Sequence, residues 1–174
     1  MRKNITISWL YLAAGGALAL HLTTPAAAQD CADPALPAEF SNWASPAAQE
    51  AAPDEGHLDD AAITVGQAVE VTLRQTQLVT YPVRPAKPVG SVSHGGLLRF
   101  HVPKAGTYRI ALGTPAWIDV LKGTEPLVSS AHGHGPECSG IRKIVDFDLT
   151  PGTYTLQVSA SASAQVSVLL VPAA

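Results

Sequence analysis

Residues 145–158 read VDFDLTPGTYTLQV, and this stretch indicates the kind of fold. Apolar side chains stand at every second position up to Leu149, where they alternate with Asp146 and Asp148. The same two-residue period returns after the Pro-Gly turn. Because successive side chains of a strand point to opposite faces, this period predicts two β-strands, each with one buried face, joined by a tight turn.

A similar turn stands 46 residues earlier in the chain. Residues 105–110 read AGTYRI, and residues 151–156 read PGTYTL. In both copies we expect the glycine to take a positive φ angle, and the tyrosine to bury its ring while its hydroxyl bonds a backbone group. The repeat therefore predicts two hairpins with the same turn chemistry.

Strand-like alternation continues over most of the chain beyond residue 63, interrupted by Gly or Pro. Further alternating segments are 69–73, 98–102, 108–112 and 166–170. This pattern is typical of an all-β protein, and it predicts a jelly-roll-like antiparallel β-sandwich over residues 63–174. The side chains expected inside it are Leu98, Phe100, Val102, Tyr108, Ile110, Val145, Phe147, Leu149, Tyr154 and Leu156.

Residues 1–28 have the order of a secretory signal peptide. Two basic residues follow Met1, an apolar run extends from Ile5 to Leu22, and small residues lead up to Ala28. We therefore expect cleavage after Ala28 and a periplasmic or secreted protein with no membrane span. An uncleaved membrane anchor is the alternative, since the apolar run approaches the length that spans a bilayer.

Residues 29–62 read as an Ala/Pro-rich acidic arm. The arm and the residues up to Leu73 contain nine acids and no Lys or Arg. The helical spacing of Leu36, Phe40 and Trp43 predicts one short helical turn that docks on the domain. The few basic residues elsewhere are scattered, and the net charge of the chain is −3, which excludes the footprint of a nucleic-acid-binding protein.

Two cysteines, Cys31 and Cys138, are present. In an oxidising compartment an even number of cysteines indicates disulfides, and here only one pairing exists. Closing so long a loop contributes up to about 4–5 kcal/mol to stability in the chain-entropy model. A free Cys138 thiolate that binds a metal is the alternative.

Histidines near the second cysteine are the candidate metal ligands. His132 and His134 stand at alternate positions of a Gly-rich loop, so in an extended chain both rings project to one side, as suits Zn²⁺ or Cu²⁺. His94 precedes two glycines and could supply a third imidazole, with Glu137 as a fourth ligand. Solvated loop histidines without a metal are the alternative. Met1 is the only methionine, which argues against a Cu(I) or blue-copper site.

Two resemblances to known families follow from short motifs. FHV at 100–102 with AGTY at 105–108, WIDV at 117–120 and FDLTPGTY at 147–154 make residues 98–171 resemble the bacterial pre-peptidase C-terminal domain. That resemblance implies a jelly-roll-like sandwich of the kind appended to secreted proteases.

The second resemblance rests on SHGGL at 93–97, WIDV at 117–120 and HGHGPECSGIRK at 132–143. These motifs are similar to a family of short exported proteobacterial proteins, mostly uncharacterised, of which some are called homogentisate dioxygenases. That name implies a metal-dependent oxidoreductase whose iron is held by two His and one Glu.

Several further features of the sequence have a structural interpretation as well as a functional one. Proline at every third position of residues 82–88 predicts an extended connector. Trp117 could line a groove for a sugar or a peptide, or it could be a core or edge aromatic. A set of charged residues could share an outward face as cross-strand pairs or as a Ca²⁺ or acid/base site. These are Asp119, Asp146, Asp148, Arg99 and Arg109.

Familiar enzyme motifs are missing from the sequence: it has no G-x-S-x-G, no H-E-x-x-H and no P-loop. The function that the sequence favours is a non-catalytic exported accessory or binding module of the cell envelope, with a protein partner or a small ligand. A periplasmic Zn- or Cu(II)-binding protein that uses the histidine loop is the first alternative. A metal-dependent oxidoreductase such as a dioxygenase, with iron, is the second.

Overall fold

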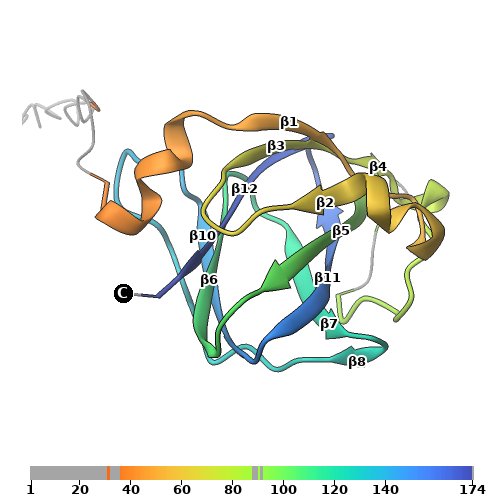
Figure 1. Ribbon diagram of the computed structural model, residues 1–174. Helices are drawn as coiled ribbons and strands as arrows, with labels where there is room; N and C mark the ends of the chain where they lie inside the picture. Colours follow the sequence, from red (N-terminus) through yellow and green to blue (C-terminus); the bar gives the residue numbers. More distant parts are fainter. Residues whose placement is uncertain (1–30, 32–35, 88–89, 91, 174) are drawn as a thin grey trace, which may run out of the picture. The chain divides into compact units, whose positions relative to one another are not determined.

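The computed structural model describes Cys31 and residues 36–87, 90 and 92–173, which form a β-sandwich (Figure 1). One sheet, called sheet A here, contains β1 (Ala47–Glu50), β3 (Val69–Thr72), β6 (Gly106–Leu112), β9 (Ala131–Gly133), β10 (Lys143–Leu149) and β12 (Gln165–Pro172). The other, sheet B, contains β2 (Ala62–Ile63), β4 (Arg74–Gln75), β5 (His94–Val102), β7 (Trp117–Lys122), β8 (Glu125–Pro126) and β11 (Gly152–Ser161). The predicted signal peptide lies outside the described residues.

The strand order is β1-β3-β12-β6-β10-β9 in sheet A and β2-β5-β11-β7-β8 in sheet B, with β4 beside β5. Three short 3-10 helices lie among the described residues, namely η1 (Ala38–Ala44), η2 (Glu55–Ala61) and η3 (Thr76–Leu78). No described helix combines the length and the apolar character needed to cross a membrane.

The predicted all-β sandwich is confirmed, and so is its core. All ten side chains that the alternation places inside are buried, each with at most 5% of its surface exposed. They come from β5, β6, β10 and β11, so both sheets contribute to the main core between them. The outward positions differ from one another: His101 on β5 is exposed, whereas Ala111 on β6 and Gln157 on β11 are fully buried.

The two Gly-Thr-Tyr turns share the predicted tyrosine contact. The Tyr108 hydroxyl donates to the Lys104 carbonyl at 3.0 Å, and the Tyr154 hydroxyl donates to the Thr150 carbonyl at 2.8 Å. Each hydroxyl thus bonds the backbone four residues earlier, which ties the incoming loop to the strand that follows it. The predicted positive φ is found at Gly152 (150°), but among the described residues Gly106 does not share it.

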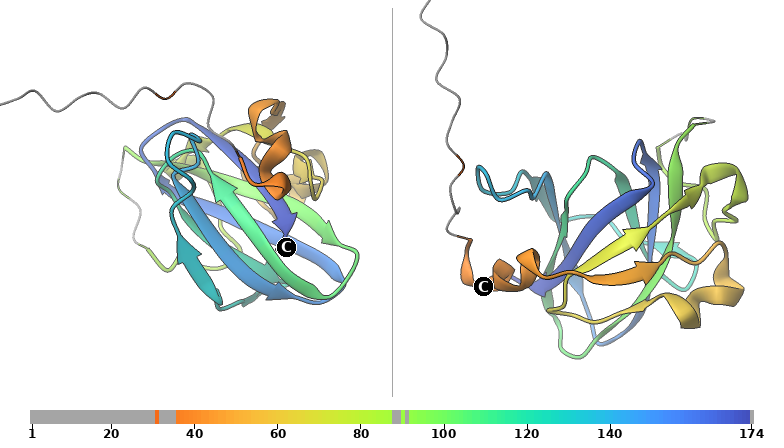
Figure 2. Two further views of the ribbon diagram at one scale, coloured as in Figure 1. Left: turned by 90° about the vertical axis from the view of Figure 1, so that its left-hand side faces the viewer. Right: turned by 90° about the horizontal axis from the view of Figure 1, so that it is seen from above.

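The segment before residue 63 belongs to the sandwich, where the sequence indicated an arm. β1 pairs with β3 and β2 pairs with β5, both in parallel, so this one segment contributes to both sheets. Figures 1 and 2 show it passing from η1 on one side of the domain to η2 on the other. The parallel pairs are possible because long connections, which parallel strands require, separate the partners in the sequence.

Small side chains explain why an Ala-rich stretch fits there. Ala51 and Ala52 are buried in the main core, and Ala52 exchanges two backbone hydrogen bonds of 2.9 Å with Leu97 of β5. A Cβ atom placed on Gly96 would lie 2.4 Å from the Cβ of Ala51. The backbones therefore approach closely only because both positions carry almost no side chain.

The predicted helical turn is present as η1. Phe40 and Trp43 are buried in a second cluster on the outer face of sheet A, and Leu36 packs against it. The other members of this cluster are Ala68, Ala111, Ile141, Leu169 and Val171.

Acids of the N-terminal segment, which has no Lys or Arg of its own, form ion pairs with arginines of the later strands. Glu39 pairs with Arg109 at 3.0 Å, Glu50 with Arg74 at 3.7 Å, and Asp59 with Arg99. The pairs of Glu50 and Asp59 are exposed, and exposed pairs contribute about 0–1 kcal/mol each, so these two orient the segment more than they stabilise it. The Glu39–Arg109 pair is partly buried.

We predict that Tyr154→Phe destabilises the protein by about 1–3 kcal/mol, and more than Tyr108→Phe does. The Thr150 amide also donates to the Tyr154 hydroxyl, at 3.1 Å, so the substitution removes the partner of two backbone groups. Urea unfolding of the two variants measures the difference. If Tyr154→Phe lowered the free energy of unfolding no more than Tyr108→Phe does, the role of the Tyr154 hydroxyl would be contradicted.

Candidate functional site

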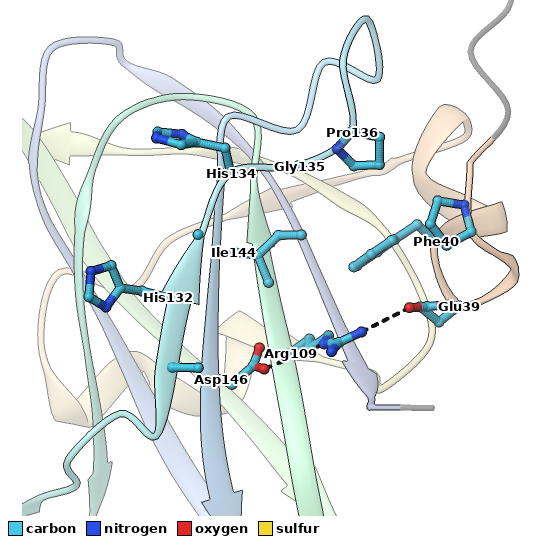
Figure 3. Close-up of a pocket in the computed structure, with 12 residues that line it drawn as sticks. Glu39, Phe40, Arg109, His132, His134, Gly135, Pro136, Ile144 and Asp146 are labelled. Carbon is cyan, nitrogen blue, oxygen red and sulfur yellow. Dashed lines mark hydrogen bonds and ion pairs between the residues drawn. The ribbon is translucent and has the colours of Figure 1, made fainter.

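A pocket of about 440 Å³ lies between η1 and the β9 side of sheet A (Figure 3). Its apolar walls come from η1, the loop after β9, and β10, and its polar groups come from η1, β6, β9 and β10. The lining residues are Pro37, Glu39, Phe40, Arg109, Ala131, His132, Gly133, His134, Gly135, Pro136, Ile144 and Asp146.

Arg109 is the central polar group of this pocket. It is the register partner of Asp146 on the neighbouring strand β10, and its Nε lies 3.5 Å from Asp146 Oδ2. Its Nη1 lies 3.0 Å from Glu39 Oε1 on η1. Two carboxylates thus hold one guanidinium in place, and since an arginine carries five N–H donors, three donors are not used by these contacts.

His132 and His134 lie at the rim, on and just after the edge strand β9. Both are exposed, and in Figure 3 their rings lie on the side of β9 away from Arg109. The Nδ1 atom of His134 lies 3.1 Å from the Arg142 carbonyl oxygen. Because a carbonyl only accepts, Nδ1 must carry the proton, which leaves Nε2 of a neutral ring as the acceptor.

The structure does not bring His94 to this pair. His94 begins β5 of sheet B, opposite Gln75 and Ser161, whereas His132 belongs to sheet A. Within the described parts of the chain, no three His, Cys, Asp or Glu side chains are grouped so that they could hold a metal ion. The predicted convergence of three imidazoles is therefore wrong, because the two histidine motifs fall on different sheets.

Glu137 and Cys138 lie on the loop that follows the pocket wall, and neither joins a ligand set. Glu137 is exposed, and Cys138 is bonded to Cys31, so it is not a free thiolate. The predicted disulfide is confirmed, with Cα atoms 5.3 Å apart across a sequence separation of 107.

The loop that carries Cys138 is compact. The Ser139 hydroxyl donates to the Pro136 carbonyl at 2.6 Å, and the Ile141 amide donates to the Ser139 hydroxyl at 3.1 Å. Gly135 lies against Ile141, since a Cβ atom on Gly135 would be 2.4 Å from the Ile141 Cβ. Together with the disulfide, these contacts fix the wall of the pocket formed by Gly135 and Pro136.

The charged residues expected on one outward face are divided between the two sheets. Arg109 and Asp146 pair on sheet A, where Asp148 accepts a hydrogen bond from the Thr107 hydroxyl at 2.6 Å. On sheet B, Arg99 pairs with Asp59 and Asp119 accepts from the Trp117 indole. The alternation correctly placed these side chains outside the core, but it carries no information on which sheet each strand joins. Glu39, which completes the pocket, gave no signal in the sequence.

Comparison with known proteins finds similarity among solved structures. No family model matches the chain, and no curated protein is significantly similar to it. A solved structure, the pre-peptidase C-terminal domain of a collagenase from Bacillus anthracis, is similar over 72% of this chain and 95% of that one, with 14% identity and a TM-score of 0.38. The neighbour is of the kind that the sequence motifs resemble, but a similarity of this size assigns neither family nor function.

Proposed function

We propose that this chain is an exported, non-catalytic binding module that holds an extended peptide segment of a cell-envelope partner in the pocket beside β9. The order of residues 1–28 supports export, and the Cys31–Cys138 disulfide is of a kind that persists in oxidising compartments.

Arg109 carries the binding proposal. It is held by Glu39 and Asp146, one third of its side chain is exposed, and it keeps N–H donors for a carbonyl or carboxylate oxygen. Ile144 and Pro136, which are half-buried, supply apolar surface beside it. A peptide offers this combination of backbone oxygens and apolar side chains.

The edge strand supports an extended ligand. Among the described strands, β9 ends the order of sheet A beside β10, so its outer edge presents backbone groups to an added strand. Added strands gain affinity from main-chain hydrogen bonds and specificity from side-chain pockets. Gly133, which lines the pocket, has nothing within 4 Å of where its Cβ would lie and so leaves the approach open.

A photo-crosslinking residue in place of Ala131 tests this function in the exporting host. We expect one defined adduct, since Ala131 lines the pocket, and no adduct from the same residue at Lys104, an exposed position in the loop between β5 and β6. Arg109→Ala should lower the yield about tenfold, because a hydrogen bond to a charged group contributes about 1.5–3 kcal/mol.

Arg109→Lys, which keeps the charge, should retain part of the yield, and thermal melting verifies that both variants fold. Adducts of equal yield with and without Arg109 would contradict the proposal. A protein whose mass still includes residues 1–28 would contradict cleavage of the signal.

A second candidate function is binding of Zn²⁺ or Cu²⁺ by His132 and His134. The contact between His134 Nδ1 and the Arg142 carbonyl favours it, because ligating histidines commonly bond their second ring nitrogen to such a group. His132 on β9 and His134 just after it have the i, i+2 spacing that favours both rings on one side of an extended chain. Solvent would complete the coordination of a two-imidazole site.

We predict that calorimetry with ZnCl₂ or CuCl₂ detects a site that His132→Ala and His134→Ala each weaken about tenfold or more. His101→Ala is the matched control, since His101 is also exposed but lies on sheet B. Binding that all three variants retain unchanged would show that the pair is not a metal site.

A further inference from the structure

The outer face of sheet B carries a group of polar side chains that the pocket on sheet A does not include. Gln157 on β11 is the register partner of Asp119 on β7, and Ser159 is the partner of Trp117. Paired residues of neighbouring strands project to the same face, so the four side chains lie together. We call them the polar cluster.

Three atoms of the polar cluster are buried and have no hydrogen-bond partner among the described residues. Gln157 and Ser159 have no exposed surface at all. The unpartnered atoms are Asp119 Oδ2, Gln157 Nε2 and Ser159 Oγ. Asp119 does use its other oxygen, which accepts a hydrogen bond of 2.9 Å from the Trp117 indole. Buried polar atoms are nearly always paired in folded proteins, so three orphaned atoms on adjacent residues indicate a site made for other polar groups.

A strap, residues 81–87, covers this cluster. The Tyr81 hydroxyl donates to the Val158 carbonyl at 2.9 Å, and the Val83 amide donates to Gln157 Oε1 at a long 3.3 Å. Two residues of the strap are prolines, which have no amide hydrogen to offer. The strap therefore excludes water from the polar cluster but satisfies few of its groups.

Two lysines approach the aromatic member of the cluster. Lys87 Nζ lies 5.7 Å and Lys143 Nζ 5.3 Å from the centre of the Trp117 ring, and Lys143 Nζ also donates to the Ala116 carbonyl at 3.0 Å. Burial, followed by the charge of Asp119, raises the pKa of Tyr81 to about 12. Burial and nearby Lys87 lower the pKa of Lys143, against the opposing effect of Asp119. These groups thus form one electrostatic unit.

The chemistry of the unpartnered atoms matches a polyhydroxylated ligand. A carboxylate oxygen accepts, an amide nitrogen donates, and a serine hydroxyl does both. A sugar hydroxyl also does both, so neighbouring hydroxyls can satisfy this set. The indole of Trp117 offers an apolar surface to the ring of a sugar, while the two ammonium groups could pair with a carboxylate on it.

We propose that the polar cluster is a saccharide-binding site, and that the strap covers it when no saccharide is bound. Binding displaces Val83 from Gln157, and sugar hydroxyls take over its long hydrogen bond. Sugar hydroxyls also become the partners of the three unpartnered atoms. Because the covered state must open first, the strap lowers the apparent affinity by the fraction of molecules in which it is closed. This site is independent of the proposed peptide pocket on sheet A.

The test is an NMR titration of the protein purified from its exporting host. The probes are chitotetraose, which is neutral, and tetragalacturonate, which carries carboxylates. We expect at least one of them to shift the indole N–H signal of Trp117 and to leave that of Trp43 in place, since Trp43 belongs to η1 and is buried against sheet A. A response to tetragalacturonate alone would assign a role to Lys87 and Lys143.

Variants separate binding from folding. Asp119→Asn should weaken binding about tenfold or more, since it removes the charged acceptor. Asp148→Asn, on sheet A, is the matched control and should bind as the wild type does. Tyr81→Phe and, as a second strap variant, Val83→Pro should bind several-fold more tightly, because each removes one strap contact. An unchanged Trp43 signal verifies folding in every variant.

Three results would overturn the proposal. One is a Trp117 signal that neither saccharide shifts, which would mean that ordered waters alone occupy the polar cluster. Another is equal binding by wild type and Asp119→Asn. The third is strap variants that bind no more tightly than wild type. Arg109→Ala should leave saccharide binding unchanged, so failure here is distinguishable from failure of the peptide proposal.

Discussion

The pairing of one short segment with both sheets is the interaction on which the rest of the structure depends. The Ala51 amide donates to the Thr72 carbonyl of sheet A at 3.0 Å, and Ala52 exchanges its bonds with Leu97 of sheet B. Adjacent residues thus connect the two layers of the sandwich. The same segment places η1 on the outer face of sheet A, and η1 supplies Glu39 and Phe40 to the pocket.

The disulfide extends this arrangement to the other wall of the pocket. Cys31 precedes η1, and Cys138 belongs to the loop that follows Pro136. The apolar cluster around Phe40 and Trp43 includes Ile141 from the same loop. Full burial of a large apolar side chain contributes about 1.5–3 kcal/mol, more than an exposed ion pair does. Burial and the crosslink therefore hold η1 in place, while Glu39 and Arg109 set its orientation.

Much of the fold could be predicted because it depends on local patterns. The two-residue period of residues 145–158 identifies strands and their buried faces, and Phe147 and Leu156 are buried as expected. The arm was harder to interpret, since an Ala-rich stretch has no period to detect. It approaches β5 closely only because Gly96 on that distant strand leaves room for Ala51.

The candidate sites could be predicted only in part, because each depends on which strands become neighbours. His132 lies on β9 and His134 directly follows it, so local spacing was enough to place them together. His94 belongs to the other sheet, and alternation has no means of assigning a strand to a sheet. The polar cluster joins β7 to β11 under a strap from a third part of the sequence. Trp117 gave a weak indication of a ligand groove, but Gln157 and Ser159 gave none.

Hydrogen exchange of the Ala51 and Ala52 amides tests most directly whether the N-terminal segment is an integral part of the sandwich. The Ala51 amide donates to the Thr72 carbonyl on β3, and the Ala52 amide donates to the Leu97 carbonyl on β5. Both residues are buried in the main core. Protection should therefore match that of the β10 and β11 amides, which open only when the domain unfolds globally. Exchange of Ala51 and Ala52 at the rate of exposed loops, while β10 and β11 stay protected, would contradict this account.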